Sequence, residues 1–262
     1  MSILLKIVRY EIQAHLRSKW LWVYTLFFGL ITDMLYRFGG TGAQVVISLL
    51  NVVLVVIPLV CLIFGVIYLY NSREFIELLL TQPINRNQLY WGLYFGLVIP
   101  LSTGFVLGLL IPVIYLPLQG DYLAAFANLL VTGLAFTFIF CALAFFLAVK
   151  FEDKIKGLGS AIGLWLFFII IYDGLFMFLL FTFADFPLEN VSILFSLVNP
   201  VDLGRIFMLL QLDIAALMGY TGAAFSRFFG SNLGIVISLT AMFVWIVLPG
   251  FFAQKIFLKK DF

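Results

Sequence analysis

A short polar run in the second half of the chain has the residue types and spacing of a capped helix start. Asn199, Pro200, Asp202 and Arg205 all lie in the run NPVDLGRI. Asparagine can cap a helix whose first turn holds a proline, and the helix dipole favours an aspartate there. Arg205 follows Asp202 by three residues, which allows the two side chains to pair. We interpret the run as a capped helix start, and a docking or gating role is the alternative that the sequence leaves open.

Two further carboxylates fall within apolar stretches. Asp173 lies about 22 Å along a predicted span at 158–183, from the rise of an α-helix. An ionisable group within a membrane span is a functional candidate. Asp173 could instead lie at the level of the lipid headgroups and meet Arg37 or Arg205. Asp33 precedes Arg37 by four residues, and the simplest interpretation of that spacing is a local pair.

The segment 71–88, NSREFIELLLTQPINRNQ, predicts a short helix with an apolar stripe. Asn71 and Glu74 predict a capping box at its start, and Pro83 predicts its end. Acidic residues would lie at the positive end of the helix dipole. The stripe consists of Phe75, Leu78 and Leu79, with Ile76 and Leu80 beside it. Such a helix could dock into a partner protein, or it could pack on lipid.

The composition shows what kind of protein must position these residues. Of the 262 residues, 64% are hydrophobic, only 11% are charged and 31 are Phe, and the mean hydropathy is +1.17. So few charged side chains exclude an ordinary soluble enzyme, a secreted disulfide scaffold and a disordered chain. A net charge of +2 gives no indication of nucleic-acid binding. We therefore predict an integral membrane protein.

Motifs for catalysis or metal binding are absent from the sequence. It has no GxxxxGK[ST] loop for ATP and no HExxH or GxSxG motif. His15 is the single histidine, and Cys61 and Cys141 lie in apolar runs without a CxxC pair. The soft ligands Met177, Met208 and Met218 show no regular spacing. We predict no catalytic residue and no metal site in this chain.

The predicted fold is an all-α membrane protein with one domain, 1–262. The amphipathic segment 2–19 predicts a helix lying along the membrane surface, followed at once by two tryptophans. Six spans are predicted at 20–36, 43–70, 89–118, 122–149, 158–183 and 233–254. The segment 184–231 is too long for a turn and too apolar for a solvated loop, so we expect surface or re-entrant helices there.

The distribution of Lys and Arg predicts the orientation. With both termini in the cytoplasm, twelve of these residues lie inside and three outside, which is a strong positive-inside bias. The segment 71–88 is then cytoplasmic, and the segment 184–231 forms an outer cap. Because no cleavage site follows the basic first helix, we predict an uncleaved multi-pass protein of a bacterial inner membrane.

The stretch Glu77-Leu-Leu-Leu-Thr-Gln-Pro83, followed by Arg86, resembles the coupling segment of type-2 ABC transporter permeases (ABC-2). In that family an amphipathic elbow helix precedes six spans, as 2–19 does here. The resemblance implies that 71–88 docks on a separate cytoplasmic ATPase, which binds ATP and Mg²⁺ in place of this chain. The implied coupling residues are Glu74, Phe75, Glu77, Leu78, Leu79, Leu80, Pro83 and Arg86.

The Asn-Pro-x-Asp-x-x-Arg run, after a span that carries Tyr172-Asp173, resembles more narrowly the NosY-type permeases. These are membrane subunits of the NosDFY complex, which serves maturation of nitrous oxide reductase. The resemblance implies a homodimer, a NosF-like ATPase and a NosD-like periplasmic β-helical protein that delivers copper. It also implies that Asn199, Pro200, Asp202 and Arg205 contact that outer partner or form a gate.

The residues leave other functions open. An apolar, Phe-rich chain also suits a generic ABC-2 exporter of a lipid-like or sulfur-containing compound. A membrane enzyme or a stand-alone anchor is the third hypothesis, and the lack of a convergent His/Asp/Glu set argues against it. The favoured prediction is a permease subunit that is not itself an enzyme.

Overall fold

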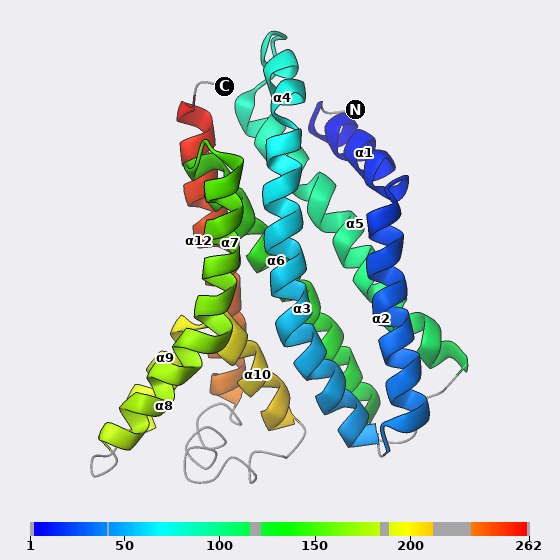
Figure 1. Cartoon of the computed structure of the whole chain (residues 1–262), viewed down its shortest axis with the longest axis vertical. Coiled ribbons are helices and arrows are strands. Elements are labelled where there is room, and N and C mark those ends of the chain that lie inside the picture. The colour runs from blue at the N-terminus through cyan, green and yellow to red at the C-terminus, as the bar shows by residue number, and fades with distance from the viewer. Residues whose placement is uncertain (1–2, 41, 116–121, 184–188, 212–231, 261–262) are drawn as a thin grey trace.

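The computed structural model describes residues 3–40, 42–115, 122–183, 189–211 and 232–260, and among these residues no β-strand forms. The predicted all-α fold is confirmed. The long helices run side by side as a bundle (Figure 1). The short helix α4 (Arg73–Leu80) lies at one end, together with the start of α1 and the end of α12. We call this the α4 end and the other the opposite end.

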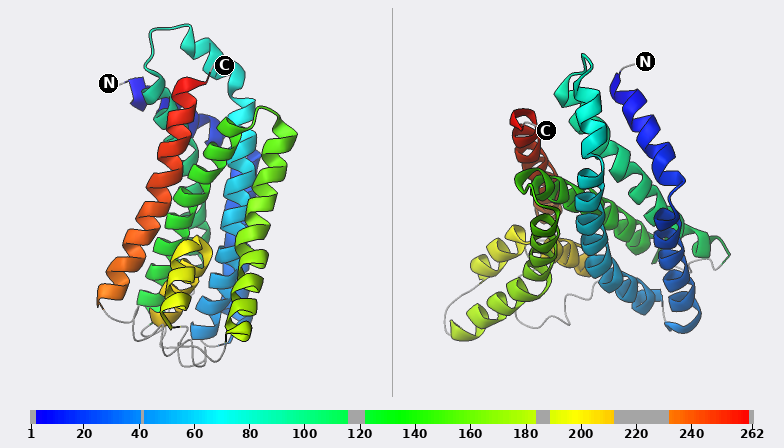
Figure 2. Two further views of the ribbon diagram at one scale, coloured as in Figure 1. Left: turned by 90° about the vertical axis from the view of Figure 1, so that its left-hand side faces the viewer. Right: turned by 45° about the horizontal axis from the view of Figure 1, so that its top comes forward.

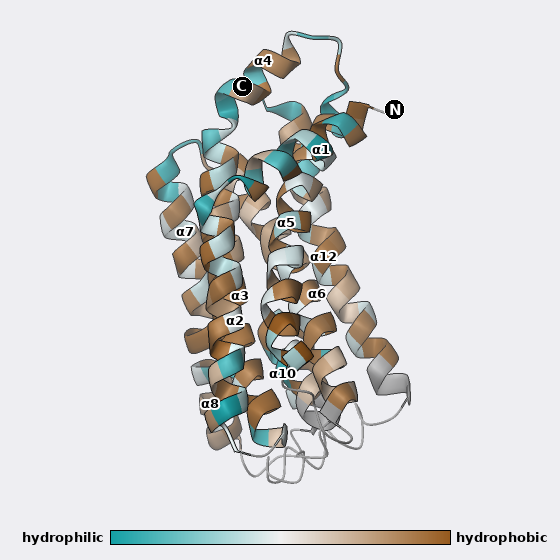
Figure 3. Ribbon diagram, turned by 90° about the vertical axis from the view of Figure 1, so that its right-hand side faces the viewer, coloured by the Kyte–Doolittle hydropathy of each residue, from teal (hydrophilic) through white to brown (hydrophobic). Residues whose placement is uncertain are grey.

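Five described helical segments are long and apolar enough to cross a membrane. They are α3 (Gly42–Asn71), α5 (Arg86–Tyr115), α6 (Tyr122–Lys150), the continuous run of α7 (Lys154–Leu166), η1 (Phe167–Ile171) and α8 (Tyr172–Thr182), and α12 (Asn232–Lys259). They correspond to five of the six predicted spans. Hydrophobic residues follow the length of the bundle and hydrophilic ones gather at the α4 end (Figure 3).

Helix α2 (Lys19–Phe38), predicted as the first span, is not among these five. Its tryptophans and tyrosines and three charged residues lower its hydropathy. With 20 residues it is still about 30 Å long. It runs along α5 and beside α3 in the bundle (Figure 1). Its length and its position in the bundle are therefore the two reasons for treating α2 as a membrane span.

The helices α9 (Glu189–Val198) and α10 (Pro200–Gln211) form a sharply bent pair. The bend is 113° and falls at Asn199, and the two helices together are apolar enough for a broken span or a re-entrant element. This agrees with the helices predicted within 184–231. Residues 184–188 and 212–231 of that segment lie outside the described residues. We refer to α9 and α10 as the bent pair.

The order of the helices places the run from α7 to α8 at an edge of the bundle. Helices α12, α6, α3 and α7 lie side by side in that order (Figure 2, left). Within the described residues only 11% of the membrane-length window of Lys154–Thr182 is buried, against 67% for α6. The fifth predicted span is therefore held by few neighbours, which gives its individual hydrogen bonds more weight.

Glycines on one side of α5 let the first two helices approach it closely. A Cβ at Gly92 would meet Ile7 of α1 (Ile3–Leu16) at 2.8 Å. A Cβ at Gly108 would meet Phe28 of α2 at 2.7 Å. By contrast, a Cβ at Gly159 on α7 would meet nothing within 4 Å in the described chain. Both helices carry pairs of glycines four residues apart. On α5 these glycines lie at a contact with another helix, whereas on α7 they face no described neighbour.

Substituting these glycines should separate the two cases. Gly108→Ala is expected to lower the free energy of unfolding by about 1–3 kcal/mol, because both Phe28 and the backbone oxygen of Thr25 are in the way. Gly159→Ala is the matched control, and it should be neutral or stabilising by up to about 1 kcal/mol, since alanine favours the helix. Thermal unfolding of the purified chain measures both. Equal losses would show that the α2–α5 contact is looser than described.

Helix α1 buries a carboxyl group in its contact with α5. Glu11 is 5% exposed and lies against Gly96, while Lys6, Arg9 and Gln13 face outward as the amphipathic pattern predicts. Burial raises the pKa of Glu11 above its ordinary value of 4.5, against smaller opposite effects of Tyr68 and His15. Ionisation of Glu11 therefore works against the docking of α1.

The docking of α1 should consequently be firmer in mild acid. Because the folded state binds the Glu11 proton more tightly than the unfolded state, the cost is absent below about pH 4.5 and develops as the pH rises through the raised folded pKa. Glu11→Gln should remove this dependence and protect α1 better at neutral pH. Hydrogen exchange of α1 amides at about pH 4.5 and about pH 7.5, corrected for intrinsic rates, measures it, because the lower pH lies at the ordinary pKa of the carboxyl group. A wild-type profile that is flat with pH would contradict the buried carboxyl.

Candidate functional site

The buried side chain of Asn199 organises the bend between α9 and α10. Its Oδ1 accepts a hydrogen bond from the Val201 N–H at 3.0 Å, so the predicted helix cap is present. Its Nδ2 donates to the backbone oxygen of Phe168 and to Asp202 Oδ2, both at 2.9 Å. Pro200 follows as the first residue of α10, where no backbone donor is needed. The bend is thus bonded directly to span five.

The partner of Asn199 belongs to a π-helical turn. Phe168 lies within η1, the five-residue π-helix that interrupts span five between α7 and α8. The wider turn changes the direction of the following helix, and such π-turns are frequent at functional sites. No residue pattern in the sequence predicted it.

Arg205 joins two carboxylates from different helices. Its Nη1 lies 3.0 Å from Asp173 Oδ2 on α8 and 3.3 Å from Asp202 Oδ1 on its own helix. The predicted pair with Asp202 is therefore present, and of the two partners considered for Asp173 the structure selects Arg205. The side chain of Asp202 is 11% exposed, and those of Arg205 and Asp173 are each 34% exposed. We call Asn199, Asp202, Arg205 and Asp173 the polar cluster.

Two aromatic residues satisfy the carbonyl groups at the end of α9. The Tyr172 hydroxyl donates to the backbone oxygen of Phe195 at 2.6 Å, and Trp245 Nε1 donates to that of Leu197 at 3.3 Å. Such groups have no partner within their own helix and need one away from water. The sequence analysis missed Trp245, because contacts between separate helices leave no local signal. Tyr172 could be noticed only as the neighbour of Asp173.

Helix α10 is seated firmly against α6. A Cβ at Gly204 would collide with the ring of Phe136, so glycine permits this close approach. Val201, Leu203 and Met208 of α10 are all buried. Helix α10 is therefore the well-packed helix of the bent pair. The polar cluster bonds span five to the bent pair.

The second predicted carboxylate forms a separate site. Asp33 accepts from Arg37 Nε at 3.0 Å, as the local pairing predicts, and from the Tyr115 hydroxyl at 3.0 Å. Arg37 therefore pairs with Asp33 and not with Asp173. Asp33 and Tyr115 also line a largely apolar groove of 360 Å³ between α2 and α5.

Helix α4 is present, but its start differs from the prediction. The cap residue is Ser72, and it makes no side-chain cap bond, so the predicted capping box of Asn71 and Glu74 is wrong. The reason is that α3 continues through Asn71, whose side chain accepts from Lys154 Nζ at 3.1 Å. The helix ends before Pro83, as predicted.

The apolar stripe of α4 is also placed differently. Ile76, expected beside the stripe, is its fully buried centre. Phe75, Leu79 and Leu80 are partly buried against the core, and Phe75 stacks on Tyr10 of α1 with ring centroids 5.6 Å apart. Leu78 alone projects, with 59% exposure, between the exposed Glu74 and Glu77. We call Glu74, Glu77 and Leu78 the α4 surface.

The end of α3 and the first residue of α4 are bonded to the turn that precedes span five. The Tyr70 hydroxyl donates to the backbone oxygens of Phe151 at 2.7 Å and Asp153 at 3.1 Å. Arg73 Nη2 also reaches the Phe151 oxygen, at 3.4 Å. A Cβ at Gly157 would collide with the Tyr70 hydroxyl, so α7 packs directly on this tyrosine. Span five is thus attached at one end to the junction of α3 and α4, mainly through Tyr70 of α3, and in its other half to the bent pair.

Arg86 serves the structure in a way that its sequence position did not reveal. Its Nη1 donates to the backbone oxygens of Leu258 at 3.2 Å and Lys260 at 3.0 Å. Asn87 accepts from Gln254 of α12 at 2.6 Å. The predicted coupling residue Arg86 therefore lies away from the α4 surface and ties the start of α5 to the end of α12.

The described residues offer little for metal binding. Among them, no group of three or more His, Cys, Asp or Glu side chains is arranged to hold an ion. Cys61 and Cys141 are free and buried. Met218 lies outside the described residues. What this arrangement provides is a set of hydrogen bonds and ion pairs that connect separate helices.

Comparisons with known proteins agree with the resemblance predicted from the sequence. No protein-family model matches the chain. A probable ABC transporter permease protein NosY from Pseudomonas aeruginosa is 29% identical over 236 residues, covering 84% of this chain and 86% of the relative. A protein of the same name from Stutzerimonas stutzeri is 25% identical over 260 residues, covering 92% and 91%. The chain is a multi-pass membrane protein similar to permease subunits of ABC transporters.

Proposed function

We propose that this chain is the membrane subunit of a NosY-type ABC transporter and works as a mechanical transmitter. A separate cytoplasmic ATPase hydrolyses ATP with Mg²⁺, and the chain converts its movement into a change of the bent pair at the periplasmic face. One observation carries the proposal. The turn that begins span five is hydrogen-bonded to Tyr70 at the end of α3 and to Arg73 at the start of α4, and the other half of the span is bonded to the polar cluster.

The α4 surface is the proposed docking site for a NosF-like ATPase. Leu78 projects from a helix whose other apolar residues are held by the core. An exposed leucine flanked by two glutamates suits an apolar pocket with a basic rim. Burying that side chain would contribute roughly 1.5–3 kcal/mol. Because α4 rests on α1 and on the base of α3, a push on Leu78 is transmitted to the bundle.

The proposed path from α4 to the periplasmic face follows span five. Movement of α4 acts through Tyr70 and Arg73 on the turn at Phe151, where span five begins. At the π-turn the same span is bonded to Asn199, and beyond it Asp173 pairs with Arg205. A π-turn has a wide backbone geometry that can rearrange locally. Two discrete arrangements of the polar cluster would make the path a switch.

The periplasmic role is proposed from the resemblance. The bent pair would contact a NosD-like copper-delivery protein, and two copies of the chain would form the membrane part of the complex. Movement of the bent pair would serve copper delivery by that partner for the maturation of nitrous oxide reductase, and no substrate needs to cross the membrane. The proposed location is a bacterial inner membrane with both termini in the cytoplasm. The lysine and arginine bias supports this orientation, as do the start of α1 and end of α12 at one end of the bundle.

Purification of the tagged chain from native membranes in mild detergent tests the proposal. Recovery of an ABC ATPase together with a periplasmic β-helical protein is the expected result. Recovery of the ATPase alone would refute the copper-delivery role while leaving an ABC permease. Recovery of neither would return α4 to an ordinary helix at the membrane surface.

A second function, export of a lipid-like or sulfur-containing compound, is favoured by the groove between α2 and α5. The groove is largely apolar and has Asp33 and Tyr115 among its lining residues. Gly29 lines it, and a Cβ there would meet only the Gly108 oxygen at 3.6 Å, so Gly29→Phe fills the groove without a collision at its Cβ. ATP-driven uptake of a fluorescent lipid into inverted vesicles, abolished by Gly29→Phe, would establish export in place of mechanical transmission.

A further inference from the structure

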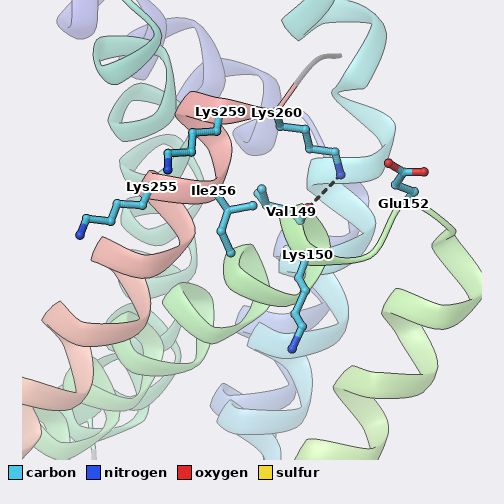
Figure 4. Close-up of a pocket in the computed structure, with 7 residues that line it drawn as sticks. All are labelled: Val149, Lys150, Glu152, Lys255, Ile256, Lys259 and Lys260. Carbon is cyan, nitrogen blue, oxygen red and sulfur yellow. Dashed lines mark hydrogen bonds between the residues drawn. The ribbon is translucent and has the colours of Figure 1, made fainter.

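Four lysines surround a pocket between the ends of α6 and α12. Figure 4 shows Lys150 projecting from the end of α6, and Lys255, Lys259 and Lys260 carried by the last turns of α12 and the residue that follows it. The pocket has a volume of 390 Å³, and among the described residues that line it Glu152 is the one acidic residue. These described lining residues therefore carry three more positive charges than negative ones.

Aromatic rings and a backbone oxygen contact three of the four lysines, Lys150, Lys255 and Lys260. No ion pair within 4.0 Å joins any of the four to an acidic side chain in the described ranges. Lys150 Nζ lies 5.6 Å from the ring centroid of Phe146, and Lys255 Nζ lies 4.5 Å from that of Phe251. Lys260 Nζ donates to the Val149 backbone oxygen at 2.8 Å. Among the described residues, the positive charge of this pocket is thus balanced only in part, by Glu152, which forms no ion pair within 4.0 Å.

The position of the pocket is that of a lipid headgroup. Helices α6 and α12 are both long and apolar enough to cross a membrane, and these candidate spans end at Lys150 and Lys259. Their ends mark the level at which phospholipid phosphates lie. Basic pockets between spans at this level bind anionic headgroups. A positive-inside bias accounts for lysines at this end of the bundle but not for four of them lining one pocket.

We propose that this lysine pocket binds the phosphate of an anionic phospholipid. The amino groups of Lys150, Lys255 and Lys259 would contact the phosphate, and the acyl chains would lie along α6 and α12. Lys260, whose pKa is lowered by burial and by the nearby Arg73, would be stabilised in its charged form. Arg86 at the start of α5 donates to the backbone oxygens of Leu258 and Lys260. A lipid bound at the end of α12 would therefore also stabilise the contact between α5 and α12.

Native mass spectrometry of the purified full chain tests the proposal. The chain is titrated with phosphatidylglycerol, with phosphatidylcholine and, separately, with inorganic phosphate. We expect phosphatidylglycerol to be retained selectively. The double substitution Lys255→Gln with Lys259→Gln should weaken its binding by roughly 30-fold, at about 1 kcal/mol for each lysine.

The matched control removes two lysines from the same end but outside the pocket. Lys6→Gln with Lys156→Gln replaces two exposed side chains of α1 and α7 and should keep phosphatidylglycerol binding within about twofold. Equal loss in the control would reduce the effect to general surface charge and overturn the proposal. Competition by inorganic phosphate would identify a soluble anion as the ligand, which also overturns it.

One further outcome would replace the lipid with another occupant. If Lys255→Gln with Lys259→Gln abolishes recovery of a cytoplasmic protein while lipid binding is unchanged, the pocket is a protein-docking surface. In that case the lipid site is excluded. Thermal unfolding of each variant shows that the differences arise in a folded chain.

Discussion

Arg205→Leu is expected to abolish transmission to the periplasmic face while the ATPase stays bound. The substitution leaves Asp173 and Asp202 without their cation in a largely apolar setting. Removing one partner of a fully buried ion pair typically costs about 3–5 kcal/mol, and because the side chains of Arg205 and Asp173 are each 34% exposed, the expected loss of stability is smaller, about 1–2 kcal/mol. Two measurements are needed: thermal unfolding of the chain, and the copper content of nitrous oxide reductase matured in cells that carry the variant.

Conservative and paired substitutions keep this prediction apart from a general loss of folding. Arg205→Lys retains the charge but lacks the planar fork that reaches two carboxylates, so an intermediate loss is expected. Combining Arg205→Leu with Asp173→Asn and Asp202→Asn removes the unpaired charges and should restore most of the stability but not the copper content. Restoration of both would show that the polar cluster serves stability alone. Loss of the ATPase from the complex would show damage beyond the bent pair.

The parts of this site that the sequence predicted are those formed by neighbours along one helix. The cap at Asn199 and the pair of Asp202 with Arg205 depend only on spacing within a turn, which a sequence displays directly. The partner of Asp173 lies 32 residues away, and the sequence narrowed it to two arginines without deciding between them. The contacts to Phe168 and Trp245 depend on a π-turn and on the packing of separate helices, for which the residues carry no local signal.

The glycine pairs make the same point about packing. Gly92 with Gly96, and Gly159 with Gly163, have the same spacing in the sequence. In the structure the first pair receives Ile7 and Glu11 of α1, whereas the second faces no described neighbour. A small residue permits a close approach but does not select the helix that makes it. The partner is determined by the arrangement of all the helices.

For α4, hydrophobic periodicity predicted a helix with one apolar face but misjudged which residues the core would use. A helix of two turns can rotate by one residue at little cost in propensity, and its junction with α3 sets the rotation. Extension of α3 through Asn71 brings Ile76 inward, so that Leu78 projects. That shift identifies the residue on which the proposed docking should depend most.

Leu78→Asp is expected to release the ATPase. If Leu78 is the apolar anchor of the contact, replacing it with a charge should weaken binding by at least about 2 kcal/mol, or roughly 30-fold. Its 59% exposure means that the fold itself should lose little, so the melting temperature should hardly change. Retention of the ATPase during purification, followed as a function of detergent washing, measures the effect.

The matched control is Ile155→Asp, which places the same charge on another exposed apolar residue at the α4 end. Ile155 is 80% exposed at the start of α7 and lies outside the α4 surface. It should retain the ATPase, while Glu77→Lys should weaken the contact because it reverses the acidic flank of Leu78. If Ile155→Asp released the ATPase and Leu78→Asp did not, docking would have to be reassigned to the start of span five. The bonds from Tyr70 and Arg73 would then carry the force in the reverse direction, from α7 toward α4.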